Sequence, residues 1–235
     1  MKDKIVLITG GSRGIGRAAA EQFINSGATV IIIHSNPNVK IDIPVARAIV
    51  ADVSDETAVK NAIDSIVSEF GRIDILVNSA GIAIDKEWDE RTVADFKKTL
   101  DVNLIGTYII SKYVGEIMMK NKSGKIVNVS STSGLNDFSP YAVDYNASKC
   151  GQISLTKSLA LQFSPFVNVN AVAPGWVDTD MNKDLPADYL EGEAQKVCLK
   201  RIAKPSEIAS IIKFLASDDA SYINGTTIIA DGGRL

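Results

Sequence analysis

Residues 4–16 read Lys-Ile-Val-Leu-Ile-Thr-Gly-Gly-Ser-Arg-Gly-Ile-Gly, an apolar run rich in β-branched residues that leads into a glycine turn. The next residues follow an amphipathic helical pattern, with an apolar side formed by Ala18, Ala19, Phe23 and Ile24. Strand, glycine turn and helix in this order are the setting of a nucleotide-binding turn. Glycines let the backbone approach a pyrophosphate, and the first helical amides attract its charge. The spacing Gly-x-x-x-Gly-x-Gly differs from the common Gly-x-Gly-x-x-Gly, so a plain strand-to-helix connection remains an alternative.

Strands and helices alternate along the rest of the chain. Apolar runs predict further strands at 28–34, 46–51, 73–77, 125–129, 167–172 and 226–230. Helical spacing predicts helices at 56–70, at roughly 92–120, around Tyr145 and Lys149, and at 205–216. Segment 36–45 carries Pro37 and Pro44 and is too short for a helix of normal length. With no linker or repeat, this alternation predicts a single domain over residues 1–235, a Rossmann-like doubly wound parallel sheet with helices on both faces.

Composition narrows the classes of function. The chain has 235 residues, 46% of them hydrophobic, and a net charge of -3, which is typical of a soluble globular protein and not of a nucleic-acid binder. No apolar run is long enough to span a membrane and no signal peptide precedes the first strand, so we expect a cytoplasmic protein. Cys150 and Cys198 are expected to be free thiols, and a single histidine, His34, argues against a zinc site or a Ser-His-Asp triad.

Tyr145 and Lys149 are candidate catalytic residues. Four residues apart on a predicted helix, they lie on one face, one turn from each other. A tyrosine hydroxyl has a reference pKa of about 10, and a neighbouring ammonium lowers that pKa by favouring the phenolate. Such a pair could act in acid–base catalysis. The same spacing also occurs where a packed ring lies beside a solvated ammonium.

Small and polar residues follow several predicted strands. They include Asn78-Ser79-Ala80-Gly81, the hydroxyl-rich run from Ser130 to Gly134, and Ala173-Pro174-Gly175. In open parallel sheets, ligands bind outside the carboxyl ends of the strands, so we expect the site at this edge. Asn103 lies inside the long predicted helix, although asparagine is a poor helix former. Its side chain is therefore either exposed to solvent or part of a functional site.

The end of the second strand bears on the cofactor. It reads His34-Ser35-Asn36 and lacks the carboxylate that normally binds an adenosine ribose and would repel a 2′-phosphate. Arg13 in the glycine turn and Lys40 nearby could pair with that phosphate. We therefore expect NADP(H) to be preferred, with NAD(H) possible. Alternatively, Arg13 simply faces solvent.

Taken together, these residues resemble the short-chain dehydrogenase/reductase family over essentially the whole chain. The matching pieces are the glycine turn, Asp52-Val53, Asn78 to Gly81, Asn103, Ser131 three residues before Gly134, Tyr145 with Lys149, Pro174-Gly175 and the closing Asp231-Gly232-Gly233. The resemblance implies a seven-stranded sheet and a nicotinamide cofactor. It also implies a homo-oligomer, a dimer or tetramer, in which Ile153, Leu155, Leu159 and Phe163 serve either the interface or the core.

The resemblance assigns roles to individual residues. Tyr145 would give a proton to the substrate carbonyl, and Lys149 would bind the nicotinamide ribose and lower the tyrosine pKa. Ser131 would hold the substrate oxygen, although Ser130, Thr132 or Ser133 could compete because the spacing to Tyr145 is about one residue long. Asn103 would anchor a water that joins Lys149 to a proton relay. The expected cofactor-binding residues, besides Tyr145 and Lys149, are Gly10, Ser12, Arg13, Gly14, Ile15, Gly16, His34, Ser35, Asp52, Val53, Asn78, Ala80, Gly81, Pro174, Gly175, Val177 and Thr179.

Within the family, the chain is most similar to the 3-oxoacyl-acyl-carrier-protein reductases of fatty acid biosynthesis. Lys122 and Lys183 occupy places where that subgroup carries basic residues that would attract an acidic carrier protein, although both could be ordinary surface lysines. A dehydrogenase of a small alcohol, sugar or cyclic ketone is the alternative enzyme, and a nucleotide-binding protein without catalysis is the alternative outside enzymes. Segment 176–200, mixed in polarity, is expected to form a substrate lid.

Overall fold

The structure, a computed structural model, describes residues 1–234. Within them, seven strands form one sheet in the order β3-β2-β1-β4-β5-β6-β7, and each neighbouring pair is parallel. The strands are β1 (Ile5–Thr9), β2 (Thr29–His34), β3 (Arg47–Val50), β4 (Ile75–Asn78), β5 (Gly124–Val129), β6 (Val167–Pro174) and β7 (Thr227–Ala230). The predicted doubly wound parallel sheet is confirmed, and each predicted strand overlaps an observed one.

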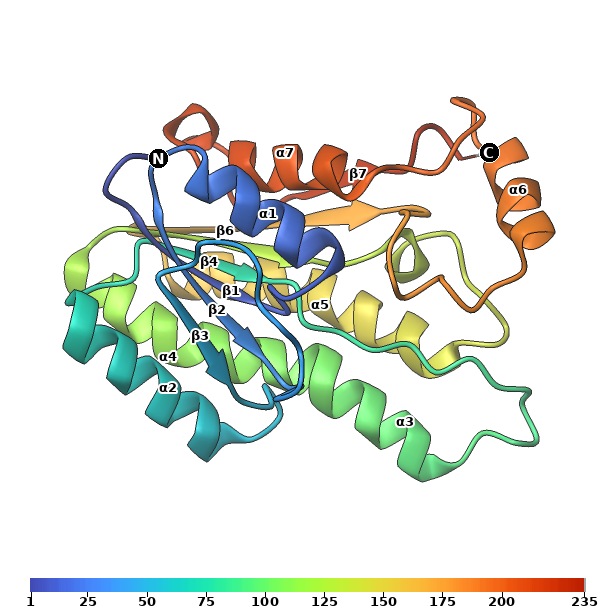
Figure 1. The fold of residues 1–235 in the computed structure, drawn as a ribbon, viewed down its shortest axis with the longest axis horizontal. Helices are drawn as coiled ribbons and strands as arrows, with labels where there is room; N and C mark the ends of the chain where they lie inside the picture. Colours follow the sequence, from blue (N-terminus) through green and yellow to red (C-terminus); the bar gives the residue numbers. More distant parts are fainter. Residues whose placement is uncertain (235) are drawn as a thin grey trace.

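Helices cover both faces of the sheet (Figure 1). They are α1 (Gly14–Ile24), α2 (Glu56–Phe70), α3 (Val93–Leu100), α4 (Gly106–Asn121), α5 (Val143–Gln162), α6 (Ala187–Gln195) and α7 (Pro205–Leu215). Helices α1 and α7 pack on one face, whereas α2, α4 and α5 pack on the other. Helix α6 stands apart from both layers, beside the end of the chain (Figure 1).

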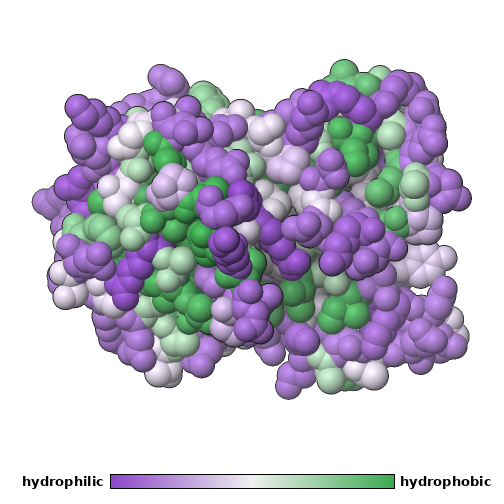
Figure 2. Space-filling model, in the orientation of Figure 1, coloured by the Kyte–Doolittle hydropathy of each residue, from purple (hydrophilic) through white to green (hydrophobic). Residues whose placement is uncertain are grey.

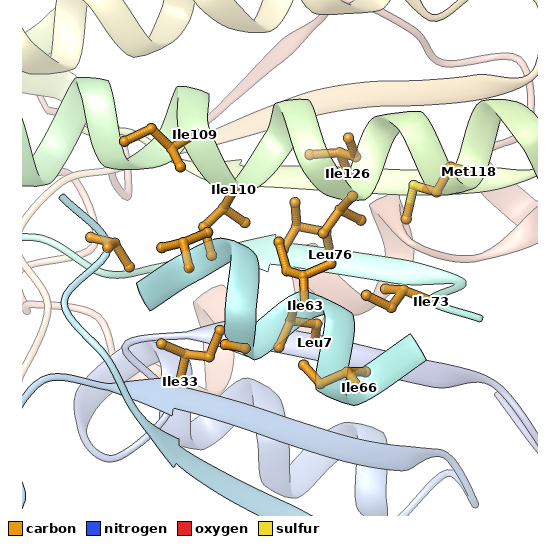
Figure 3. Packing of buried hydrophobic residues seen from close by; sticks show 14 of the residues in the cluster. Leu7, Ile33, Ile63, Ile66, Ile73, Leu76, Ile109, Ile110, Met118 and Ile126 are labelled. Carbon is orange, nitrogen blue, oxygen red and sulfur yellow. The ribbon is translucent and has the colours of Figure 1, made fainter. Parts of the chain in front are cut away.

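The strands feed two hydrophobic cores because successive side chains point to opposite faces. Leu7 of β1 packs with Ile63 of α2 and Ile110 of α4, as Figure 3 shows. Its neighbours Val6 and Ile8 pack against α1 and α7 on the other face. All five side chains are almost completely buried, and each stabilises the fold by roughly 1.5–3 kcal/mol. Helix α5 also belongs to the first core, since Leu159 and Phe163 are buried there.

Residues 36–46 form an irregular segment instead of a helix, as the two prolines predicted. Ile41, Ile43 and Val45 of this segment pack against the second core. They cover the sheet edge incompletely, and Val50 on the edge strand β3 is 52% exposed. Figure 2 shows hydrophobic residues gathered over this part of the molecule, on the left of the view.

The long helical region predicted at roughly 92–120 is confirmed, since residues 93–121 are helical without a break. Helix α3 begins with a capping box between Thr92 and Asp95. A π-helical turn, Asp101–Ile105, then separates α3 from α4. Single π-turns inside helices are frequent at functional sites. This one contains Asn103, the residue that the sequence had marked as a poor helix former.

The structure bears on the cysteines, on metal sites and on membrane spans. Cys150 and Cys198 are free thiols. Over residues 1–234, no group of three or more histidine, cysteine, aspartate or glutamate side chains is arranged to hold a metal ion. Within the same range, no helix combines the length and the apolar character that crossing a membrane requires.

Candidate active site

The crevice between β1 and β4 lies where the strand order reverses, which is the expected ligand position in a doubly wound sheet. The glycine turn after β1 and residues 79–81 after β4 meet there. The Thr9 hydroxyl accepts hydrogen bonds from the main-chain nitrogens of Ser79 and Ala80, each at 3.2 Å. The strand ends thus fix the two loops against each other.

Two glycines in the turn have no room for a side chain. A Cβ on Gly10 would lie 2.8 Å from the backbone of Ala80, and Gly10 has φ +67°, a left-handed conformation that favours glycine. A Cβ on Gly16 would lie 2.3 Å from the Gly10 carbonyl oxygen. The close approach leaves the start of α1 as a bare backbone surface, which fits the pyrophosphate of a dinucleotide.

A groove of about 310 Å³ runs beside this turn. It is lined by Gly14 at the start of α1 and by Thr179 from the segment after β6. A Cβ on Gly14 would lie 3.4 Å from the Thr179 side chain. Val177, in the same segment, is buried and bridges to Ala203. Two distant predicted cofactor-binding residues, Gly14 and Thr179, are therefore neighbours.

The end of β2 offers no carboxylate toward the glycine turn. The Gly10 nitrogen donates to the Ile33 carbonyl at 2.8 Å, so the turn lies directly against β2. His34 is buried, with Nδ1 3.0 Å from the Asn36 carbonyl oxygen. The nearest acidic residue in the following segment, Asp42, pairs with Arg17 at 2.5 Å. Arg13 itself is exposed at the N-terminal boundary of α1.

Asn78 was expected to line the cofactor, but its side chain faces the core. Its Nδ2 donates to Ser111 Oγ and to Asn128 Oδ1, each at 2.9 Å, and the residue is 2% exposed. The amide therefore joins α4 to β5 beneath the crevice. Gly81, two residues past the strand, is closer to the expected site: a Cβ there would lie 3.8 Å from Lys149 Nζ. Asp52, also expected at the cofactor, has its carboxylate bonded to Ser54.

Ser131, Tyr145 and Lys149 come together at the carboxyl end of β5. Ser131 follows the strand and precedes a short 3₁₀ turn, Thr132–Gly134, while α5 carries the other two residues. Two of the three competing hydroxyls, those of Ser130 and Thr132, have other partners, whereas Ser133 remains a competitor. Ser130 is buried and donates to the Lys149 carbonyl at 3.0 Å, and Thr132 is buried and faces Asp137. Of the hydroxyls in this run, Ser131 is the one that acts on the pKa of the Tyr145 phenol.

The two ionisable groups have displaced pKa values. Burial raises the pKa of Tyr145 to about 12, the Ser131 hydroxyl opposes this shift, and the charge of Asp85 adds to it. Burial also lowers the pKa of Lys149 to about 7. Desolvation disfavours the charged form in both cases, so the two shifts have opposite signs. In the chain alone, the expected lowering of the Tyr145 pKa by Lys149 is not found.

Lys149 is held by groups that sequence reasoning missed. Its Nζ donates to the Val129 carbonyl at 2.8 Å and to Gln152 Oε1 at 2.9 Å, and it lies 5.4 Å from the centre of the Tyr145 ring. Gln152 is three residues beyond Lys149, a spacing that places both on one helix face. That spacing was visible in the sequence. Its significance was not, because glutamine on a helix is usually solvated.

Asn103, in the π-helical turn, forms hydrogen bonds with both ends of its side-chain amide. It is fully buried, its Oδ1 accepts from the Ile82 nitrogen at 2.8 Å, and its Nδ2 donates to Ser148 Oγ at 3.0 Å. These bonds join the segment after β4 to α5. The structure therefore brings all four predicted catalytic residues to one place.

A buried ion pair anchors the start of α5. Arg91 and Asp144 are 2.6 Å apart, with side chains 6% and 0% exposed. Asp144 also accepts from Thr99 Oγ1 at 2.7 Å and from the Tyr145 nitrogen at 2.9 Å. Because Arg91 lies far from α5 in sequence, no local pattern predicted this contact. The pair fixes the backbone that carries Tyr145.

The expected lid segment, 176–200, contains α6 and is fastened by a second cluster of charges. Glu193 of α6 is 4% exposed and accepts from Trp176 Nε1 at 3.0 Å. Arg234 pairs with Glu193 at 2.7 Å and with Asp137 at 2.8 Å. The end of the chain therefore connects α6 to the loop that follows Ser131. Whether the segment moves as a lid remains a prediction.

The two lysines expected to attract a carrier protein are not neighbours in the chain. Lys122 ends α4 just before β5 begins, at the amino edge of the sheet, and its Nζ lies 5.8 Å from the centre of the Phe166 ring. Lys183 is exposed in segment 176–200, beyond the carboxyl edge. Within one chain, the structure does not bring Lys122 to the cleft.

Known proteins with similar sequences and structures agree with this geometry. A family model described as enoyl-(acyl carrier protein) reductase matches residues 10–234. The chain is 38% identical over 242 residues to the 3-oxoacyl-[acyl-carrier-protein] reductase FabG of Thermotoga maritima, which covers 99% of this chain and 98% of that protein. It is 35% identical over 229 residues to the 3-oxoacyl-[acyl-carrier-protein] reductase MabA of Mycobacterium tuberculosis, with 97% and 91% covered.

Two solved structures are equally similar in fold. Ligand-free aldohexose dehydrogenase of Thermoplasma acidophilum has a TM-score of 0.92 and 35% identity, with 99% of this chain and 94% of that chain covered. Levodione reductase has a TM-score of 0.92 and 32% identity, with 99% and 97% covered. These matches extend over nearly the whole chain, and the sheet order and the Ser131, Tyr145 and Lys149 cluster accompany them. The chain therefore belongs to the short-chain dehydrogenase/reductase family, a family of oxidoreductases that use a nicotinamide cofactor.

Proposed function

We propose that this enzyme reduces a 3-oxoacyl thioester carried on acyl carrier protein, with NADPH as the preferred cofactor. The observation that supports the substrate class best is the relatedness to FabG of Thermotoga maritima over 99% of the chain. The cluster of Ser131, Tyr145 and Lys149 supports the reaction type, since it offers a proton donor, a donor to the substrate oxygen and an ammonium in one buried place.

In this reaction, the bound nicotinamide would supply hydride to the carbonyl carbon. Ser131 would donate a hydrogen bond to the carbonyl oxygen and stabilise the charge that develops on it. Tyr145 would give its phenolic proton to that oxygen. Lys149 would bind the cofactor ribose with the one Nζ donor that remains after Val129 and Gln152. The phenol starts with a raised pKa, so the positive charge of Lys149 is needed to stabilise the phenolate as it forms.

The experiment that tests the substrate class measures oxidation of NADPH and NADH with a short 3-oxoacyl thioester, presented free and on acyl carrier protein. We expect faster turnover on the carrier than with the free thioester. Turnover of sugars or cyclic ketones, with none of either thioester, would contradict the substrate class and leave the chemistry of Tyr145 in place.

Sugar oxidation is the second candidate because of Asp85. This residue follows β4, and its charge raises the pKa of both Tyr145 and Tyr189 of α6. A carboxylate there could accept hydrogen bonds from substrate hydroxyls. The similarity to aldohexose dehydrogenase of Thermoplasma acidophilum points the same way. An Asp85→Asn variant should lose sugar turnover selectively if this alternative holds.

The preference for NADPH leads to a prediction for Arg13. The end of β2 lacks a carboxylate, Asp42 is paired with Arg17, and Arg13 is exposed beside the turn. Arg13→Ala should weaken NADPH binding roughly 10-fold or more, because a charge-assisted hydrogen bond is worth about 1.5–3 kcal/mol, and should leave NADH binding nearly unchanged. Fluorescence titration measures both dissociation constants.

The control for that titration is Arg47→Ala. Arg47 is another partly exposed arginine, but it begins β3 at the amino edge and pairs with Glu69. It should change neither dissociation constant. Equal weakening of NADPH and NADH by Arg13→Ala would contradict the proposed contact with the 2′-phosphate.

A further inference from the structure

Gln152 joins two parts of the catalytic cluster directly. Its Oε1 accepts from Lys149 Nζ at 2.9 Å, and its Nε2 donates to the main-chain carbonyl of Asn103 at 2.7 Å. The side chain is fully buried. The orientation of the amide follows from its partners, because an ammonium only donates and a carbonyl only accepts. A glutamine side chain thus connects the two groups between which the family resemblance would place a water.

The Asn103 carbonyl is fully used by side chains. Thr107 Oγ1 donates to it at 2.7 Å, in addition to Gln152 Nε2. A carbonyl oxygen has two lone pairs, so these two donors saturate it. The second Nε2 hydrogen of Gln152 goes to Thr107 Oγ1 at 2.9 Å. Asn103, Thr107 and Gln152 therefore form a closed triangle of hydrogen bonds behind Lys149.

We propose that Gln152 is a positioning residue for Lys149 and that its amide, which stands where a bridging water would lie, closes the proton route between Lys149 and the Asn103 carbonyl. This inference rests on the proposed acid–base role of Tyr145 and Lys149. An amide accepts at oxygen and donates from nitrogen, so it cannot pass a proton along as a water molecule does. Gly81 is also close to Nζ, since a Cβ on this glycine would lie 3.8 Å from it.

The proton balance is simple. During reduction, the O–H bond of Tyr145 breaks and its proton goes to the substrate oxygen, which leaves a phenolate. The phenolate then regains a proton from solvent, and the charged ammonium of Lys149 stabilises it until that proton arrives. Hydride from the cofactor supplies both electrons, so Gln152 undergoes no chemistry. Its function is to hold Nζ in place through this exchange.

Three substitutions separate this role from packing. Gln152→Leu keeps the volume but removes all three hydrogen bonds of the amide. Gln152→Ala leaves space in which water can bond to Lys149 and to the Asn103 carbonyl. A merely structural role predicts that alanine is worse than leucine, because alanine leaves a cavity. The proposal predicts the reverse: leucine should lower kcat roughly 10- to 100-fold, and alanine should recover much of that loss.

Titration of Lys149 gives a readout that needs no substrate. NMR of lysine labelled with ¹³C at Cε, assigned with Lys149→Met, reports its pKa in the cofactor-free enzyme. Gln152→Leu should lower that pKa because it removes an acceptor, and Gln152→Glu should raise it by at least about one unit because it adds a carboxylate. The other ionisable groups that face this place are Tyr145 on α5 and Asp85 after β4; the contacts from β5 and the π-helical turn are uncharged.

Gln162→Leu is the matched control, since Gln162 ends the same helix and is exposed. It should change neither kcat nor the titration. The proposal is overturned if Gln152→Leu and Gln152→Glu both leave the pKa of Lys149 unchanged, or if leucine supports faster turnover than alanine. Loss of the proposed function would instead be seen as a wild-type enzyme without reductase turnover, and the titration would still decide the position of Gln152.

Discussion

Tyr145→Phe is expected to lower kcat by about 10²–10⁴-fold, the contribution typical of a general acid, while the dissociation constant of the cofactor stays within a few fold. The phenol is the group that contacts Ser131 and lies beside Lys149. Phenylalanine keeps the ring and its packing, so the loss isolates the proton. Steady-state kinetics gives kcat, and fluorescence titration gives the dissociation constant.

Tyr222→Phe provides the control for this measurement. Tyr222 is fully exposed, beyond α7, so the Tyr222→Phe enzyme should keep the kcat and the cofactor dissociation constant of the parent. A Tyr145→Phe enzyme that keeps more than about a tenth of its turnover would show that the proton comes from elsewhere. The thermal unfolding of both variants should match the parent closely, because neither removes a buried contact of the core.

Asp144→Ala is expected to lower the free energy of unfolding by about 3–5 kcal/mol, because it leaves the Arg91 guanidinium buried without its partner. Both side chains are nearly inaccessible, and Asp144 also holds Thr99 and the Tyr145 nitrogen. Urea denaturation measures the change. Turnover should fall as well, since the start of the catalytic helix loses its anchor.

An exposed ion pair and a double variant complete this test. Lys60 and Asp64 pair on the surface of α2, so Asp64→Ala should leave the unfolding transition close to the parent. Asp144→Leu combined with Arg91→Met removes both charges, and it should be less destabilised than the sum of the single variants. A loss no greater for Asp144→Ala than for Asp64→Ala would mean that the buried pair contributes nothing.

Local patterns in the sequence were sufficient to predict the fold and most of the candidate site. Alternating apolar and amphipathic segments were enough for all seven strands, because strand and helix periods are local properties of the chain. The absence of a helix in segment 36–45 was also predictable, because proline disfavours a helix at its own position in the chain. Tyr145 and Lys149 were found because their spacing fixes their relative direction on a helix.

The surroundings of those residues depend on contacts between distant segments, which no local pattern predicts. The role of Gln152 depends on Asn103 in the π-helical turn and on Thr107 at the start of α4, which its side chain contacts only in the folded protein. Arg91 and Asp144 belong to segments far apart in sequence, so no local pattern predicts that they form an ion pair. The pKa of Tyr145 is raised, contrary to expectation, because burial depends on everything that packs around the ring. The periodicity of a sequence shows which face of a helix or strand each side chain occupies. Desolvation and pairing between distant residues arise only when separate helices and strands pack together.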